Sequence, residues 1–383
     1  MSSLLQKGTP VSQHSAAVLR ASRAPLVVSS VPDAEPGAGE VLVRVRAIAV
    51  NPVDWVIQGT GSVTYRWLRY PAVLGSDVAG EVLAVGAGVT RFRVGDRVFG
   101  LATGTDRGRD PMREGAFQET TVLLERLTAA TPSGVSDAEA AVLPLGASTA
   151  ACALFQPAHL GLRMPGDAAV PEGERGVVVV WGGSTSVGMN AVQLARAAGY
   201  DVVSTASPRN AALVRSLGAD VVVDHGDARA VEHLVEGIGG RRVVGAVALG
   251  TTSAAACIEV LRRTGGSVLA MASTPVSLDG LAGRRRLFPA MLPVFTRVGL
   301  TMARLTLRAR RAGIRSAFVW GSSLRDDEVG RRLWSEVLET GLADGTLRPV
   351  PEALVVGEGL GSVQTAIDRQ RAGVSAQKVV VTL

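Results

Sequence analysis

Small residues fill positions 182–188, where the sequence reads Gly-Gly-Ser-Thr-Ser-Val-Gly. They follow a continuous apolar run at 177–181, which is typical of a strand buried on both faces of a parallel sheet. A stretch with helical spacing comes next, at 187–198. Backbone N–H groups in such a turn can approach a pyrophosphate, and the start of the helix favours its negative charge. The pattern predicts a dinucleotide site with contacts at Gly183, Ser184, Thr185, Ser186 and Val187. The alternative is an ordinary tight turn between a strand and a helix.

The strand after this turn carries no acidic residue at its end. Sites for NAD usually place Asp or Glu roughly twenty residues beyond the turn, where it binds the ribose hydroxyls. Here 204–210 reads Ser-Thr-Ala-Ser-Pro-Arg-Asn. Ser207, Arg209 and Asn210 can instead hold a 2′-phosphate, to which Arg209 donates charge-assisted hydrogen bonds. The sequence therefore predicts NADPH as the cofactor; the alternative is that Arg209 lies solvated at the start of a helix.

Two kinds of pattern divide the chain. From 16 to 130 it reads as short strands broken by glycine and proline, and 40–50 alternates apolar and polar residues as a half-buried strand does. This half is predicted to be an all-β barrel, followed by a helix at 137–155. From 177 to 272 strands and helices alternate, which predicts a doubly wound parallel sheet. The expected segments are 177–181, 187–198, 201–205, 209–217, 221–223, 243–249, 254–262 and 267–272, and a last strand is expected at 378–383.

Length and composition narrow the class of protein. The 383 residues suffice for two or three domains, which we expect at 16–150, 151–317 and 318–383 after a flexible tail at 1–15. Only two of the 40 basic residues, Lys7 and Lys378, are lysine, so a Schiff-base lysine is not expected. Aromatic residues make up 4% of the chain and are scattered, so no nucleic-acid partner is predicted.

The cellular location is predicted from the apolar segments, the N-terminus and the cysteines. The most apolar stretch, 287–307, contains two prolines and two arginines, so no membrane span is predicted. The N-terminus lacks the apolar core of a secretion signal. Cys152 and Cys257 cannot form a disulfide framework, which favours a reducing, cytoplasmic compartment.

Several short motifs together resemble the medium-chain dehydrogenase/reductase superfamily. They are Asn-Pro-Val-Asp at 51–54, the segments 71–80 and 94–98, Leu-Pro-Leu at 143–145 with Thr149, the glycine turn, and Gly-Ala-Asp at 218–220. The resemblance implies an α/β protein with a GroES-like β-rich catalytic domain and a Rossmann domain. More narrowly, 181–188, 206–210 and 373–378 resemble the zinc-independent branch, which holds trans-acting polyketide enoyl reductases and quinone oxidoreductases.

The resemblance also implies where the cofactor lies. The nicotinamide end is expected against Asn51, Pro52, Val53, Asp54 and Thr149. The rest of the cofactor cleft is expected to be completed by Leu249, Gly250, Val374 and Ser375. His225 occupies the place of a tyrosine that commonly lies near the adenine, so it either stacks there or is a surface histidine.

No metal site is expected. The zinc enzymes of the superfamily carry histidine where this chain has Ser76, and its two cysteines and four histidines lack ligand spacing. Reduction of a conjugated C=C bond remains accessible, because the carbonyl group takes up the charge. Asp54 and Thr149 are candidate polar groups near the reacting carbon, although Asp54 can also be a turn-forming residue after Pro52. Tyr65 is the candidate proton donor, with an offset from the family tyrosine, and water is the alternative.

The sequence thus predicts an NADPH-dependent reductase of an enoyl thioester or enone in a biosynthetic pathway. Quinone reduction is the alternative activity, and a non-catalytic NADPH-binding protein is the alternative class. The expected substrate is a small molecule or an acyl group bound to an acyl carrier protein, and the enzyme is expected to be a monomer or homodimer. The arginine-rich segment 284–311 either borders the substrate cleft or is a cover helix with a solvated basic face.

Overall fold

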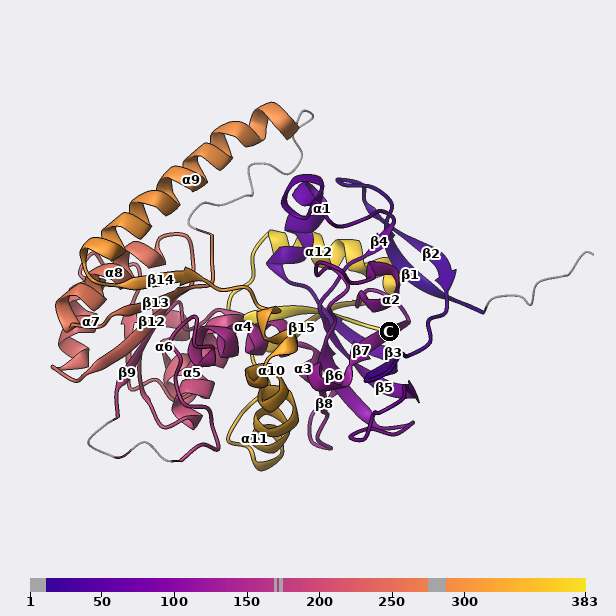
Figure 1. The fold of residues 1–383 in the computed structure, drawn as a ribbon, viewed down its shortest axis with the longest axis horizontal. Coiled ribbons are helices and arrows are strands. Elements are labelled where there is room, and N and C mark those ends of the chain that lie inside the picture. The colour runs from indigo at the N-terminus through magenta and orange to yellow at the C-terminus, as the bar shows by residue number, and fades with distance from the viewer. Residues whose placement is uncertain (1–11, 169–170, 172–174, 275–286) are drawn as a thin grey trace, which may run out of the picture.

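A computed structural model describes residues 12–168, 171, 175–274 and 287–383. Two lobes lie side by side, with β9–β14 in one and β1–β8 in the other (Figure 1). Most of the predicted tail and residues 284–286 of the arginine-rich segment lie outside the described residues. The first strand begins at Gln13, three residues before the expected start of the domain at 16.

The N-terminal lobe is built on two sheets. A seven-stranded sheet has the order β15-β16-β3-β5-β6-β8, with β7 paired to β3, and a three-stranded sheet has the order β2-β1-β4. β5 carries Gly80 where it pairs with Val45 of β3, because a Cβ at Gly80 would lie 1.9 Å from the backbone oxygen of Arg44. The strands are β1 Gln13–Leu19, β2 Leu26–Pro32, β3 Glu40–Ala49, β4 Ala72–Val73, β5 Asp77–Val85, β6 Arg97–Leu101, β7 Thr120–Leu124 and β8 Thr128–Ala130.

Two helices in this lobe differ from the prediction. The region 16–130 was expected to contain strands only, but α1 (Pro52–Thr64) is a helix of 13 residues, and α2 (Pro111–Glu114) is a short one. Pro52 occupies the first turn of α1, where its fixed φ suits a helix, and Asp54 accepts a hydrogen bond from the backbone N–H of Asn51. These helix-start signals outweigh the glycine and β-branched residues that follow.

The second lobe confirms the predicted doubly wound sheet. Its six parallel strands have the order β11-β10-β9-β12-β13-β14. All five residues of β9 are buried; Val178 and Val180 join the core on one face of the sheet, and Val177, Val179 and Trp181 the core on the other. This explains why the strand is a continuous apolar run. The strands are β9 Val177–Trp181, β10 Asp201–Ala206, β11 Val221–Asp224, β12 Val243–Ala248, β13 Val268–Met271 and β14 Arg315–Phe318.

The remaining helices cover both faces of this sheet, connect it to the first lobe or, in the case of α3 (Asp137–Ala141) and α12 (Val363–Arg371), pack against strands of the first lobe. They are α3 Asp137–Ala141, α4 Pro144–Phe155, α5 Ser186–Ala197, α6 Ala211–Ser216, α7 Ala230–Ile238, α8 Ser253–Thr264, α9 Leu287–Arg311, α10 Glu328–Arg332, α11 Leu338–Asp344 and α12 Val363–Arg371. After β14 the chain returns, and β15 (Glu352–Glu358) and β16 (Gln377–Thr382) complete the seven-stranded sheet beside β3. The active-site cleft must therefore be built from segments distant in sequence.

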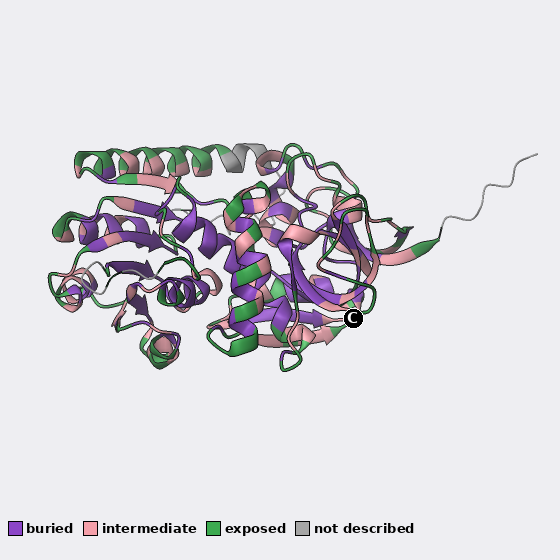
Figure 2. Cartoon of the chain, turned by 60° about the horizontal axis from the view of Figure 1, so that its bottom comes forward, coloured by how far each residue is buried: buried purple, intermediate pink, exposed green. Residues whose placement is uncertain are grey.

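Burial distinguishes α9 from the other long apolar stretch (Figure 2). Among the described residues, Asp137–Phe155 is the one helical stretch long and apolar enough to cross a membrane, and 83% of its window is buried inside the protein, as in a core helix. α9 is largely exposed and packs on the second lobe through partly buried residues such as Met302 and Leu305.

Candidate active site

The glycine turn lies between β9 and α5, as the sequence predicts. Thr185 caps the helix: its Oγ1 accepts from the N–H of Gly188 at 3.0 Å and donates to the carbonyl of Gly182 at 2.8 Å. Glycine is required at position 182 by a φ of +91° and at positions 183 and 188 by space. A Cβ at Gly183 would lie 2.1 Å from Ser204 Oγ, and one at Gly188 would lie 2.2 Å from the carbonyl oxygen of Gly182.

The turn fits a dinucleotide. The first N–H groups of α5 have no acceptor within the helix; that of Gly188 donates to Thr185 Oγ1, whereas those of Ser186 and Val187 remain available to an anion. The buried Ser186 Oγ at the same helix start has no hydrogen-bond partner in the structure. An orphaned hydroxyl beside free N–H groups, in a turn that side chains cannot fill, is a suitable cradle for a pyrophosphate.

The residues expected at the adenosine end gather beside β10. Ser207 follows the last residue of the strand, and Pro208–Asn210 forms a 3-10 turn in which Arg209 is exposed. Asn210 Nδ2 donates to Ser375 Oγ at 3.1 Å, so the loop after α12, which also contains Val374, reaches this end. His225 is half-exposed, and its Nδ1 lies 3.4 Å from Asp224 Oδ1.

Asp224 is an acidic residue that the sequence analysis did not weigh. It ends β11 opposite Ala206, the last residue of β10, so a carboxylate does lie beside the end of β10. It accepts a hydrogen bond from the N–H of Gly226 at 2.9 Å. The order of the strands, rather than the sequence of β10, brings this carboxylate there.

Leu249 and Gly250 follow β12, next to the glycine turn. The N–H of Leu249 donates to the carbonyl of Trp181 at 3.0 Å, and a Cβ at Gly182 would lie 2.9 Å from the carbonyl oxygen of Leu249. Gly250 donates its N–H to Ser273 Oγ at 2.9 Å. The structure thus places these two predicted residues against the turn.

Four buried polar side chains, Asn51, Asp54, Asp77 and Lys378, form a cluster that we call the buried polar quartet. Lys378 Nζ lies 2.8 Å from Asp77 Oδ2 and donates to Asn51 Oδ1 at 2.6 Å. Asn51 Nδ2 donates to Asp77 Oδ2 at 2.8 Å, and the N–H of Asn51 donates to Asp54 Oδ2 at 2.7 Å. Burial, together with the nearby charge of Asp77, raises the pKa of Asp54 to about 7, and its Oδ1 has no partner.

The quartet holds three segments together. Asp77 Oδ1 also accepts from the N–H of Leu145, so the start of α1, the start of α4 and the last strand are joined at one point. The alternative of Asp54 as a turn-forming residue is wrong, because Asp54 lies in the first turn of α1. Asp77 and Lys378 were missed as site residues, although Lys378 stands out as one of only two lysines.

Tyr65 and Thr149 line an inner chamber of about 170 Å³ between the lobes. Thr149 Oγ1 donates to the carbonyl of Leu145 at 2.7 Å. Burial raises the pKa of Tyr65, and the carboxylates of Asp106 and Asp54 raise it further, so the phenol stays protonated at neutral pH. The other lining residues are Val53, Ser76, Leu101, Ala102, Thr105, Asp106, Leu145, Phe318, Val319, Trp320, Gly321 and Ser322.

This lining differs from the sequence prediction in two ways. Val53 and Thr149 face the chamber, but Asp54 is not among its lining residues and belongs to the buried polar quartet. The segment 318–322, which follows β14, supplies one wall that no sequence motif indicated. Ser76 also lines the chamber, and the described part of the chain contains no group of three His, Cys, Asp or Glu side chains that could hold a metal.

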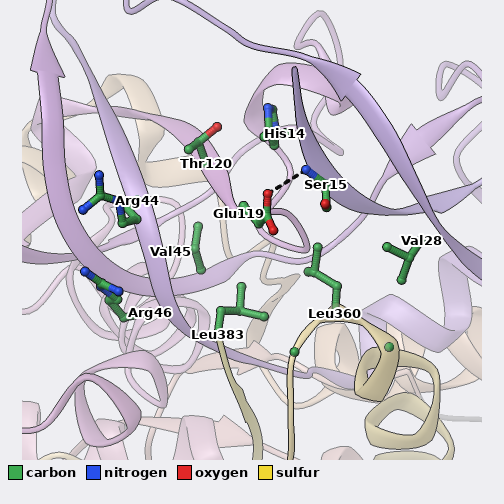
Figure 3. Close-up of a pocket in the computed structure, with 12 residues that line it drawn as sticks. His14, Ser15, Val28, Arg44, Val45, Arg46, Glu119, Thr120, Leu360 and Leu383 are labelled. Atoms are coloured by element: carbon green, nitrogen blue, oxygen red, sulfur yellow. Dashed lines mark hydrogen bonds between the residues drawn. The ribbon is translucent and has the colours of Figure 1, made fainter. Parts of the chain in front are cut away.

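A separate hollow of about 490 Å³ lies on the outer side of the first lobe (Figure 3). Val45, Leu360 and Leu383 surround it together with Arg44 and Glu119, and none of the predicted site residues lines it. It is therefore distinct from the cofactor cleft.

Comparisons with known proteins show the family to which this chain belongs. Two family models match, an alcohol dehydrogenase GroES-like domain over residues 37–133 and a zinc-binding dehydrogenase over residues 186–292. The dehydrogenase pigH of Monascus ruber is 44% identical over 365 residues, which cover 95% of this chain and 97% of that protein. The chain belongs to the medium-chain dehydrogenase/reductase superfamily.

Other members show the same full-length likeness. Trans-enoyl reductase himH of Aspergillus japonicus is 36% identical over 90% of each chain. The crystal structure of CurK enoyl reductase has the same fold, with a TM-score of 0.69 at 20% identity over 97% of this chain and 98% of that one. Membership of this oxidoreductase superfamily implies a nicotinamide cofactor, which supplies a hydride when bound. The glycine turn would hold its pyrophosphate, and the inner chamber would receive the reacting end.

Proposed function

We propose that this enzyme reduces a carbon–carbon double bond conjugated with a carbonyl group, using NADPH. The observation that carries this proposal is the inner chamber, where a protonated tyrosine faces a small space beside the cofactor cleft. Position 76, where the zinc enzymes of the superfamily carry a histidine ligand, is a serine. The 36% sequence identity to trans-enoyl reductase himH supports the same reaction class.

The chain's own part in this reaction is to stabilise charge and to move a proton. The substrate gains a hydride at Cβ and a proton at Cα, and its carbonyl oxygen carries negative charge between the two steps. Thr149 already donates its hydroxyl proton to Leu145, so it offers only lone pairs. Tyr65 has no hydrogen bond from its hydroxyl among the described residues. Tyr65 therefore supplies the proton, and the quartet keeps α1, which Tyr65 directly follows, in place.

The experiment measures NADPH oxidation at 340 nm with 3-penten-2-one, crotonyl-CoA, 1,4-naphthoquinone and an aldehyde. Turnover of the conjugated carbonyl compounds is expected, and Tyr65→Phe should lower kcat by about a hundredfold or more while leaving the Kd for NADPH unchanged. Turnover of the aldehyde alone would contradict the proposal. Unchanged kcat in Tyr65→Phe would assign the proton to water.

The choice of NADPH rests on the exposed Arg209 beside Ser207 and Asn210. Loss of charge-assisted hydrogen bonds to a 2′-phosphate should raise the Kd for NADPH by about tenfold to a hundredfold in Arg209→Ala and leave that for NADH unchanged. Arg310→Ala, which removes an exposed arginine of α9, is the matched control. Equal effects on both nucleotides would refute this role, since Asp224 favours a ribose hydroxyl at the same end.

A second candidate substrate is a thioester carried by an acidic acyl carrier protein of a biosynthetic pathway. The exposed face of α9 favours it, because Leu292, Leu300 and Leu307 lie beside Arg297 and Arg304. A carrier-loaded substrate should then be reduced faster than its CoA ester, and Arg297→Glu with Arg304→Glu should remove the difference.

Quinone reduction, favoured by exposed aromatic rings near the chamber, predicts turnover of naphthoquinone alone. A binding protein predicts NADPH affinity without turnover.

A further inference from the structure

A second hollow adjoins the inner chamber on its outer side. It has a volume of about 340 Å³. Its lining residues are Trp67, Asp106, Arg107, Trp320, Ser322, Ser323, Arg325 and Asp326. Asp106, Trp320 and Ser322 line both spaces, so the two spaces lie next to each other. We call the second hollow the outer subsite.

Aromatic rings form one wall of the outer subsite. The Tyr65 ring lies 5.1 Å from the Trp67 ring and 5.8 Å from the Trp320 ring, centroid to centroid. The indole N–H of Trp67 donates to the carbonyl of Thr105 at 3.1 Å, which fixes the orientation of that ring. Trp67 is nevertheless 39% exposed and Trp320 is 42% exposed. Two exposed tryptophans at one cleft are a preformed surface for stacking, because each offers a large flat face at little entropic cost.

The charges of the outer subsite balance one another. Asp106 accepts a hydrogen bond from Ser322 Oγ at 2.8 Å and lies 3.6 Å from Arg325, which also pairs with Asp326 at 2.8 Å. Two carboxylates and two guanidinium groups, that of Arg107 included, leave no net positive charge in the lining. The phosphates of coenzyme A or of a phosphopantetheine arm would gain little here, whereas a neutral ring with oxygen substituents finds both donors and acceptors.

Resting on the proposed reduction of a conjugated double bond, we propose that the substrate is a free small molecule in which the enone is attached to a planar, oxygenated ring. The ring stacks on Trp67 and Trp320 in the outer subsite, and the short unsaturated chain enters the inner chamber beside Tyr65. The inner chamber, at about 170 Å³, admits only a short chain, and both parts together have the size of a site for a drug-sized ligand. Trp320 thereby determines specificity through the ring and not through the reacting bond.

The experiment compares 4-phenyl-3-buten-2-one with 3-penten-2-one, which differ by a phenyl ring in place of a methyl group on the same enone. The wild-type kcat/KM should be about tenfold higher for the phenyl compound. Trp320→Ala should lower the ratio of kcat/KM for the phenyl compound to kcat/KM for 3-penten-2-one by about tenfold, mainly by raising KM for the phenyl compound. Trp320→Phe should keep most of the preference. Phe295→Ala, which removes an exposed ring of α9 that lines neither hollow, should change neither value of kcat/KM.

Two results separate this proposal from the proposed function. If crotonyl-CoA or a carrier-loaded thioester is the best substrate and Trp320→Ala affects all substrates equally, the ring subsite is overturned while the reduction stands. If no enone is reduced, binding of 4-phenyl-2-butanone, measured by isothermal titration calorimetry, still reports the subsite. Saturable binding whose Kd rises about tenfold or more in Trp320→Ala would then support the subsite and overturn the reduction.

Discussion

Lys378→Met is expected to be the most destabilising single change in the buried polar quartet. The side chain of Lys378 is 5% exposed and that of Asp77 is fully buried, with Nζ 2.8 Å from the carboxylate. Removing one partner of a buried ion pair typically costs about 3–5 kcal/mol, because the other charge stays buried without compensation. Asp77 retains two N–H donors, from Asn51 and Leu145, so we expect the lower value, about 3 kcal/mol.

The double variant Lys378→Met with Asp77→Asn removes both charges and keeps an acceptor for the N–H of Leu145. It should lose only about 1 kcal/mol, so the coupling between the two positions should be about 2 kcal/mol or more. Lys378→Arg should not restore stability, because the planar guanidinium is larger than the ammonium that the site encloses.

The assay is urea unfolding followed by tryptophan fluorescence and by far-ultraviolet circular dichroism, whose agreement tests two-state behaviour in a two-lobed protein. Arg93→Ala is the matched control, since Arg93 is 89% exposed where it pairs with Asp96 and its loss should have no measurable effect. A loss below about 1 kcal/mol in Lys378→Met, or no recovery in the double variant, would refute the argument that this ion pair is buried and mutually dependent.

Two further predictions concern the quartet and the glycine turn. Asp54 has a folded-state pKa of about 7 against an ordinary value of 3.8, so the folded protein should lose stability as the pH rises from about 4 to 7 and carry the full cost above 7. Asp54→Asn removes this pH dependence, so its free energy of unfolding relative to wild type should rise by up to about 4 kcal/mol from pH 4 to pH 8. Urea unfolding at the two pH values measures this difference. The same pH dependence of stability in the variant and the wild type would contradict the prediction. Gly188→Ala places a Cβ 2.2 Å from the Gly182 carbonyl oxygen, so it should cost about 1–3 kcal/mol and weaken NADPH binding, measured by the fluorescence of the bound nucleotide. Gly299→Ala, whose Cβ meets nothing within 4 Å, should leave both values unchanged.

The Rossmann lobe was predictable because its signals are local. β9 alternates between two cores, so every position is apolar, and the glycine turn follows it directly in sequence. The helix at 52–64 was missed although Pro52 and Asp54 are helix-start signals, because the β-rich pattern around them was extended across the whole region. Local spacing therefore predicted the cofactor turn better than it predicted the lobe that carries Tyr65.

What the sequence by itself determined is the superfamily, the doubly wound sheet and the glycine turn, since each is indicated by short motifs or by local alternation of strand and helix patterns. Only the tertiary structure decided which groups meet in the cleft. Asn51 and Lys378 are 327 positions apart and share a hydrogen bond, and Asp224 reaches the end of β10 through strand order alone. Trp67 and Trp320 line the same hollow although they lie far apart in the sequence, on segments with no motif. The physical reason is that buried charges and stacked rings depend on contacts between strands and loops that are distant in sequence. Sequence periodicity carries no information on which distant segments come into contact.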